Sequence, residues 1–255
     1  GSLCRYATDP VVNFTIMALI IIGGLGFAVW GDIRHHRRFS RLSVYSRLVV
    51  IITTVLIFGG AGVFAALEWN NPNTIGDLTV PQKLMAALFQ SVTLRTAGFA
   101  TFDQNALSDV SKAASDLLML VGGSPGSTAG GMKTTTLAIL ILSAFSVCRK
   151  KDDAEVCGRR IDGSAVKNAA AVAVMYFLLF FVGGIVISTA EGLPLSTCLY
   201  ETASAVGTVG LTLGITPQLG VLSQLILIVL MYLGRVGGLT LIYAAISNKN
   251  QSGAK

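Results

Sequence analysis

Charged residues are scarce in this sequence. They make up 13% of the 255 residues, whereas an average soluble domain carries about 25%. Hydrophobic residues make up 53%, and the mean hydropathy is +0.69. The net charge of +6 lies in short clusters between apolar runs, a pattern that suits membrane orientation better than nucleic-acid binding. This composition excludes an ordinary soluble domain and predicts an all-α integral membrane protein.

Cysteine is also scarce, which argues against two kinds of site. The four cysteines form no CxxC pair, so neither a zinc site nor a disulfide framework is indicated. His35 and His36 are adjacent but have no acidic or thiol partners in the pattern, and we interpret them as solvated loop residues. No combination of residues typical of catalysis is present, so we predict that the protein is not an enzyme and holds no covalently bound cofactor.

A glycine-rich stretch, residues 122–133 (GGSPGSTAGGMK), lies between two apolar runs. Its five glycines and Pro125 make a continuous helix very unfavourable, since glycine costs about 1 and proline about 3 kcal/mol relative to alanine. Irregular backbone at membrane depth must be buried in protein or line a watery cavity. A solvent-exposed linker is the plain alternative. A phosphate loop fails by one residue, because Met132 separates Gly131 from Lys133. We therefore predict a loop beside an ion path.

Long apolar runs predict four membrane-spanning helices. They cover residues 11–30, 48–67, 165–190 and 221–246. The first contains Gly23, Gly24 and Gly26, small residues that we interpret as a surface for close helix packing in preference to a hinge. A further apolar segment descends over residues 109–121 and resumes at residues 134–147, on either side of the glycine-rich stretch. The basic clusters at residues 34–47 and 149–160 predict cytoplasmic loops, and residues 70–80, which contain no basic residue, predict an external one.

Two segments, residues 81–93 and 193–206, are apolar but too short to span a bilayer. Each is followed by a Thr-x-Gly tripeptide, first Thr96-Ala-Gly98 and then Thr208-Val-Gly210. The order of spanning helix, short helix, Thr-x-Gly and spanning helix therefore occurs twice. We divide the chain into residues 1–33, the closing helix of an incomplete repeat, and two full repeats at residues 34–160 and 161–255.

Four segments carry a resemblance to a known family. They are residues 91–99 (SVTLRTAGF), 122–134 (GGSPGSTAGGMKT), 204–211 (SAVGTVGL) and 233–237 (LGRVG). Together they resemble the Trk/Ktr/HKT superfamily of potassium transporters, and within it the bacterial Trk/Ktr-type membrane subunits. The family builds one pore from four linked repeats, each shaped like a potassium-channel subunit. The resemblance implies that this chain is the C-terminal part of such a subunit.

The resemblance implies K⁺ as the cargo, with Na⁺ or H⁺ dependence left open. It also implies a multi-pass protein of the cell membrane in contact with lipid, a homodimer, and a cytosolic nucleotide-binding ring as a regulatory partner. The alternative, from another class of function, is a non-conducting assembly or regulatory fragment of a transporter complex.

The candidate site has three parts. Rings of backbone carbonyls replace the water shell of a cation, and glycine permits the backbone angles this requires. The predicted selectivity filter consists of Thr96, Ala97, Gly98, Thr208, Val209 and Gly210. The gate loop predicted by resemblance consists of Gly122, Gly123, Ser124, Pro125, Gly126, Ser127, Thr128, Ala129, Gly130, Gly131 and Lys133. The third part is Arg235, expected to face this loop and to donate hydrogen bonds to its carbonyls.

Several assignments stay open at the level of sequence. Each Thr-x-Gly could be a simple turn between helices, and Arg235 could extend to the cytoplasmic surface. Arg95, next to the filter, is expected to turn away from the ion and to be paired. Glu201 could hold the filter in place or could be a solvated residue at the outer surface. Asp109, Lys112 and Asp116 share a helical face and predict a paired polar stripe near that surface.

Overall fold

The computed structural model describes residues 2–36, 38–150, 155–156 and 159–237. The described chain is helical, apart from strands β1 (Glu155–Val156) and β2 (Arg159–Arg160), which pair antiparallel. The predicted all-α class is confirmed. The helices are α1 (Pro10–Leu25), α2 (Phe27–His36), α3 (Val44–Glu68), α4 (Val80–Thr93), α5 (Asp109–Leu120), α6 (Thr134–Cys148), α7 (Gly163–Glu191), α8 (Leu195–Val206) and α9 (Val221–Val236). Short 3₁₀ turns lie at Cys4–Tyr6, Phe39–Arg41, Gln104–Ala106 and Thr216–Gln218.

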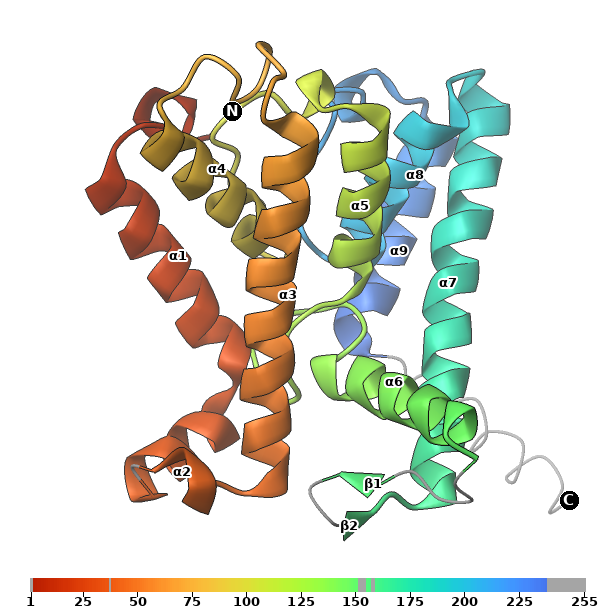
Figure 1. Cartoon of the computed structure of the whole chain (residues 1–255). Helices are drawn as coiled ribbons and strands as arrows, with labels where there is room; N and C mark the ends of the chain where they lie inside the picture. Colours follow the sequence, from red (N-terminus) through yellow and green to blue (C-terminus); the bar gives the residue numbers. More distant parts are fainter. Residues whose placement is uncertain (1, 37, 151–154, 157–158, 238–255) are drawn as a thin grey trace, which may run out of the picture.

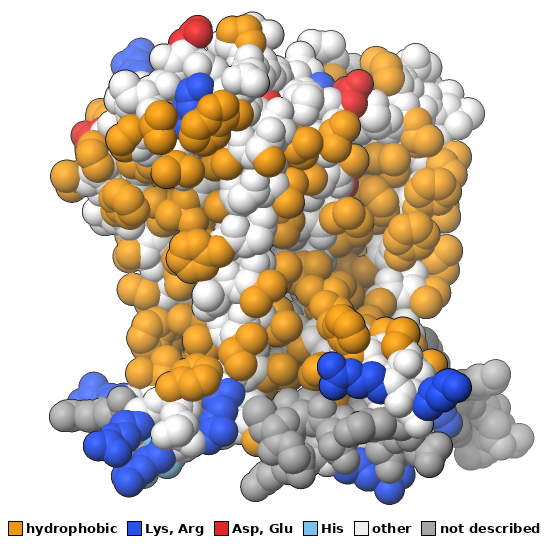
Figure 2. Space-filling view, viewed as in Figure 1, with side chains coloured by type: hydrophobic (Ala, Val, Ile, Leu, Met, Phe, Trp, Pro, Cys, Tyr) orange, Lys and Arg blue, Asp and Glu red, His pale blue; other side chains and the backbone are white. Residues whose placement is uncertain are grey.

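Two helices, α3 and α7, run the full height of the molecule (Figure 1). With 25 and 29 residues and mean hydropathies of 2.5 and 2.6, they are long and apolar enough to cross a membrane. Large apolar side chains on them face outward, such as Phe58 and Phe177. Figure 2 shows a broad hydrophobic band, with Lys and Arg gathered below it. Such a surface is stable against lipid and unfavourable in water.

The first predicted span is interrupted. Residues 11–30 do not form one helix, because α1 ends at Leu25 and α2 leaves at an angle of 95°. Gly26 lies between them with φ 83°, a conformation that glycine adopts without strain. The glycines of this segment indicate a helix-packing surface, and the break was not predicted. Counted as one broken span, α1 and α2 give the described residues up to three membrane crossings by length and composition.

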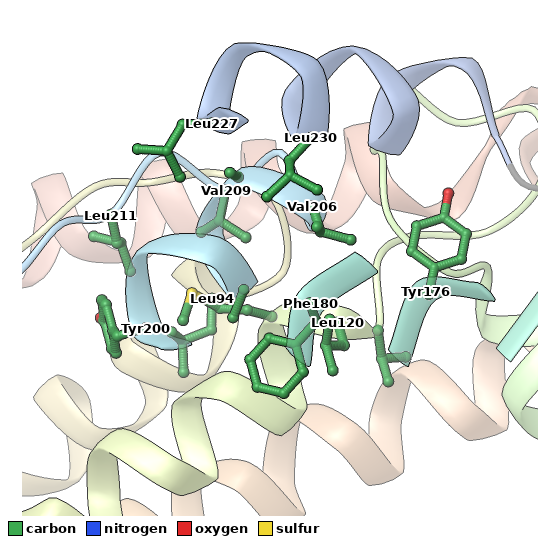
Figure 3. Packing of buried hydrophobic residues seen from close by; sticks show 14 of the residues in the cluster. Leu94, Leu120, Tyr176, Phe180, Tyr200, Val206, Val209, Leu211, Leu227 and Leu230 are labelled. Carbon is green, nitrogen blue, oxygen red and sulfur yellow. The ribbon is translucent and has the colours of Figure 1, made fainter. Parts of the chain in front are cut away.

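Two short helices, α4 and α8, end in the middle of the molecule (Figure 1). Pro81 lies in the first turn of α4, and Pro194 immediately precedes α8, positions where proline stabilises a helix start. The residues at their C-terminal ends, Leu94 and Val206, are fully buried. Both belong to one hydrophobic cluster with Tyr176, Phe180 and Leu230, shown in Figure 3. This shared core determines where the two Thr-x-Gly segments begin.

The chain between α5 and α6 changes direction. The segment after the glycine-rich stretch was expected to resume the descent, but α6 lies across the lower end of the molecule (Figure 1). It packs against α3 and α7 there. Within the last predicted span, the structure describes α9, which ends at Val236, and Gly237 has φ 88°. Its predicted continuation to residue 246 lies outside the described residues, as do Cys157 and the tail.

Candidate functional site

The two Thr-x-Gly segments share one unusual backbone pattern. Thr96 and Thr208 have φ values of 67° and 52°, and Gly98 and Gly210 have values of 76° and 91°. Positive φ is rare and strained for threonine, and it persists only where the surrounding structure imposes it. Alternation of positive and negative φ turns successive carbonyls toward one side of a segment. A simple turn between helices would not explain why both segments adopt the same alternating backbone conformation.

The two segments lie side by side. A Cβ built on Gly98 would lie only 2.2 Å from the carbonyl oxygen of Val209, so only glycine fits at this contact. Hydroxyl groups from the ends of the short helices hold both segments. Thr93 Oγ1 donates to the carbonyl of Phe99 at 2.7 Å, and the Gly210 amide donates to Ser204 Oγ at 3.1 Å. The structure thus brings together all six residues of the predicted filter.

Glu201 on α8 is buried and anchors the chain that follows the second segment. Its carboxylate accepts hydrogen bonds from Thr212 Oγ1 at 2.6 Å, the Leu213 amide at 2.9 Å and Thr216 Oγ1 at 2.8 Å. The alternative of a solvated surface residue is therefore wrong. Three charge-assisted hydrogen bonds donated to one carboxylate restrain this stretch strongly.

A buried polar network behind the segments was missed by the sequence reasoning. Gln90 Nε2 of α4 donates to Gln104 Oε1 at 2.6 Å, and Tyr200 of α8 donates to the same oxygen at 3.0 Å. All three residues are buried. The network ties the two short helices together through the 3₁₀ turn at Gln104–Ala106. The sequence signal that could have predicted this network is the presence of polar side chains within the two short apolar helices.

The glycine-rich stretch folds into a loop directly against the second segment. A Cβ on Gly130 would lie 2.1 Å from Thr208 Oγ1, and the Gly131 amide donates to the carbonyl of Gly234 at 3.2 Å. The base of the loop is closed by the bond from the Gly122 amide to the carbonyl of Met132 at 2.8 Å. Residues 122–124 and 129–132 are buried. The alternative of a solvent-exposed linker is therefore excluded.

Three cationic side chains donate hydrogen bonds to carbonyls of this loop. Arg235 binds the carbonyl of Thr128, Lys133 Nζ binds that of Ala129 at 2.6 Å, and Arg95 Nη2 binds that of Gly122 at 3.3 Å. Arg95 is buried and was expected to be paired; among the described residues it has this carbonyl partner and no ion pair. Charges are costly at membrane depth, and the carbonyl dipoles of the loop partly compensate the charges of these three side chains.

The second Thr-x-Gly segment and Arg235 line one open cleft. Its walls include Glu201, Thr208, Gly210, Thr212 and Arg235, and its volume is about 580 Å³. Gly210 is exposed in it and has nothing within 4 Å of a Cβ position. Arg235 therefore lies on the same open face as the second segment, below it along α9.

Two further expectations need correction. Lys112 Nζ lies 3.9 Å from Asp109 Oδ1, but Asp116 does not belong to an exposed stripe. It is buried, and its Oδ1 has no hydrogen-bond partner in the part of the chain that is described. His36 does have an acidic partner, since its Nδ1 lies 2.8 Å from Asp32 Oδ1. Among the described residues, no three His, Cys, Asp or Glu side chains gather into a possible metal site.

The sequence is similar to known cation transport proteins. Residues 1–253 match the family described as TrkH, cation transport protein. The chain is 37% identical over 243 residues to the Ktr system potassium uptake protein B of Bacillus subtilis, covering 95% of this chain and 55% of the relative. It is 37% identical over 257 residues to the potassium/sodium uptake protein NtpJ of Enterococcus hirae, covering 99% and 57%.

A solved structure, the potassium transporter TrkH from Vibrio parahaemolyticus, superposes with a TM-score of 0.73 at 21% identity. The match covers 91% of this chain and 51% of that one, so the likeness shows a shared fold. The chain spans about half the length of the relatives it matches. Since the family match extends over almost every residue, the chain belongs to the TrkH family of cation transport proteins.

Proposed function

We propose that this chain supplies part of a K⁺-selective pore, in which ions pass a filter and a gate to enter the cell. One observation carries the proposal: two Thr-x-Gly segments with the same alternation of φ lie in contact at the ends of two short helices. The potassium uptake named in its relatives supports K⁺ as the cargo. The Enterococcus relative is named a potassium/sodium uptake protein, which supports Na⁺ as a second transported or coupled ion.

In this proposal the carbonyls of residues 96–98 and 208–210 replace water around the ion. A complete ring needs four such segments, and the chain offers two. We assign residues 34–160 and 161–255 to two repeats that each contribute one segment, and residues 1–33 to the closing helix of another. The C-terminal ends of α4 and α8 add the partial negative charge of a helix terminus beneath the ion.

The loop at residues 122–133 acts as the gate in this proposal. It packs against Thr208, so it lies where an ion leaving the filter would pass. Arg235 holds it through the carbonyl of Thr128 and adds a positive charge that opposes K⁺. The loop moves away when transport is active, and Arg95, Lys133 and Arg235 then exchange its carbonyls for water.

The same proposal orients the protein in the cell membrane. The lower end in Figure 2 gathers Lys and Arg, which supports a cytoplasmic position for the basic clusters. A homodimer and a cytosolic nucleotide-binding ring are the proposed partners, and the ring would act on the gate from this side. Lipid covers the apolar band.

The test is K⁺ uptake by cells that lack their own uptake systems and express the protein from its complete reading frame. The parent should restore uptake, and Arg235→Ala should raise the initial rate by up to about tenfold, because a charge-assisted hydrogen bond is worth about 1.5 kcal/mol or more. Lys167→Ala, which removes an exposed cation of α7 outside the cleft, is the matched control. Absence of uptake by the parent would favour the assembly fragment. Reduced uptake by Arg235→Ala at equal abundance would mean that Arg235 supports an open pore.

A further inference from the structure

Two helices that flank the gate loop end in the same glycine motif. Gly23-x-x-Gly26 closes α1, and Gly234-x-x-Gly237 closes α9. The second glycines adopt nearly the same conformation, with φ 83° and ψ 150° at Gly26 and φ 88° and ψ 138° at Gly237. A helix that stops in this way leaves carbonyls of its last turn without helical partners.

The gate loop occupies the freed carbonyls of both helices. At α9, the Gly131 amide donates to the carbonyl of Gly234 at 3.2 Å. At α1, the Ser124 amide donates to the carbonyl of Gly24 at 3.0 Å, and Ser124 Oγ donates to that of Leu25. Arg235 belongs to the α9 motif, whereas α1 has no side chain of that kind at the corresponding position, Gly24.

The start of α2 and the first turn of α3 complete the contact at α1. The Phe27 amide donates to the carbonyl of Gly126 at 3.3 Å, and Tyr45 Oη donates to that of Pro125 at 2.9 Å. A Cβ on Gly26 would lie 2.8 Å from the Pro125 carbonyl oxygen and 2.9 Å from Ser124 Oγ. The loop therefore fits against the break only because glycine is there.

We propose that the break between α1 and α2 is the second seat of the gate loop, opposite the Arg235 contact. Tyr45 and Ser124 are positioning residues that hold the loop closed on this seat. The inference rests on the proposed role of the loop as a gate. The loop and the break form hydrogen bonds to each other's backbone groups. The loop can therefore leave only when water binds these groups instead, or when α1 and α2 straighten into one helix that pairs them internally. Because α2 begins at a residue bound to the loop, a movement of α2 acts directly on the gate.

A reversible cross-link tests the seat. A Cβ built on Gly23 would lie 3.4 Å from Thr128 Oγ1, so Gly23→Cys with Thr128→Cys places two sulfurs within reach of each other. Gly184→Cys with Thr202→Cys is the matched control, since this pair joins α7 to α8 with the same 3.4 Å separation, away from the loop. Cys4, Cys148 and Cys157 are replaced by Ser, and Cys198 by Ala, in a protein expressed from its complete reading frame.

The cross-link is scored by protection from a bulky maleimide, and K⁺ uptake is measured before and after reduction. Both pairs should cross-link on oxidation. Only the Gly23–Thr128 pair should lose uptake, to the background of cells without the protein, and reductant should restore it. Failure of this pair to cross-link while the control does would overturn the seat. Unchanged uptake in the cross-linked protein would overturn the idea that the loop must leave it.

A second variant isolates the positioning role of Tyr45. Tyr45→Phe keeps the ring and removes the hydroxyl that binds the Pro125 carbonyl, so uptake should rise by roughly two- to tenfold at equal abundance. The K⁺ over Na⁺ preference should not change, since the filter is separate. A merely structural tyrosine would show equal or lower uptake after the change, which would refute its role. If the parent takes up no K⁺, the proposed function fails, and the cross-link yield alone then decides whether the loop occupies the seat.

Discussion

At the scale of single residues, the two filter glycines differ although their φ values are alike. Gly98 is enclosed, because a side chain there would meet the carbonyl of Val209 at 2.2 Å. Gly210 opens into the cleft, with nothing within 4 Å of a Cβ position. The same tripeptide therefore differs between the two positions: the first glycine permits contact between the segments, and the second leaves open space in the cleft through which we propose that ions pass.

This difference predicts unequal effects of substitution. Gly98→Ala forces two backbones apart, so K⁺ uptake should fall by at least about tenfold, since clashes in a packed interior cost about 1–3 kcal/mol. Gly210→Ser has room and adds a hydroxyl to the ion path, so uptake should persist with a lower K⁺ over Na⁺ preference in reversal-potential measurements. Gly62→Ala, a helical position with open space, is the control. Normal uptake by Gly98→Ala would show that the segments are not in contact, and an unchanged permeability ratio in Gly210→Ser would remove Gly210 from the filter.

At the scale of elements, each long helix ends in a glutamate that holds the start of a following helix. Glu68 ends α3 and accepts from the amide and hydroxyl of Ser108, the residue that caps α5, at 3.1 and 2.7 Å. Glu191 ends α7 and accepts from the amide of Gly220, which precedes α9, at 2.9 Å and from Ser223 at 2.5 Å. These carboxylates connect the two long apolar helices to the helices of the candidate pathway.

The two glutamates should contribute unequally to stability. Glu68 also accepts from Asn71 Nδ2 at 2.7 Å and Thr74 Oγ1 at 2.8 Å, and it is almost fully buried. Glu68→Gln should therefore lower the free energy of unfolding by about 2–4 kcal/mol. The substitution removes the charge that strengthens the buried hydrogen bonds, and it replaces one accepting oxygen with an NH₂ group that faces other donors. Glu191→Gln, with fewer bonds, should cost about 1–2 kcal/mol. Thermal unfolding in detergent measures both, and an equal or reversed order would show that the Glu68 contacts are not the stronger anchor.

At the scale of the whole molecule, charge and apolar surface agree on one orientation. Lys and Arg gather at the end that carries α2 and the two strands, and the N-terminus lies at the opposite end (Figures 1 and 2). In the proposed orientation the basic loops lie on the cytoplasmic side, so the ends of α4 and α8 point inward from the external face. An ion entering from outside would meet the filter segments before the gate loop.

Thiol labelling of intact cells tests this orientation. With Cys4, Cys157 and Cys198 replaced, a membrane-impermeant maleimide should label a cysteine introduced by Asn73→Cys and should spare the native Cys148. Both positions are exposed on the protein, so membrane sidedness alone separates them. Permeabilised cells, in which both positions react, provide the control. Labelling of Cys148 with sparing of position 73 would invert the proposed topology and the direction of the pore.

The sequence alone determined the membrane class, the long helices α3 and α7, the short helices with proline at their starts, and the two Thr-x-Gly segments. These follow from composition, from apolar length and from glycine and proline chemistry, all of which are local. The roles assigned to the filter, the loop and Arg235 remain proposals. Local pattern also misled in places: the glycines of residues 23–26 indicated packing, although Gly26 breaks the helix.

Only the tertiary structure decided which groups meet. The contact of Gly98 with Val209, the seat of the loop on α1, and the carboxylate bonds of Glu68 and Glu201 join residues from separate elements or loops. Burial of Asp116 was equally invisible, because helical spacing gives a side chain's face but not what covers that face. The physical reason is that a broken helix frees backbone groups whose partners are chosen by packing, and packing depends on the whole chain at once.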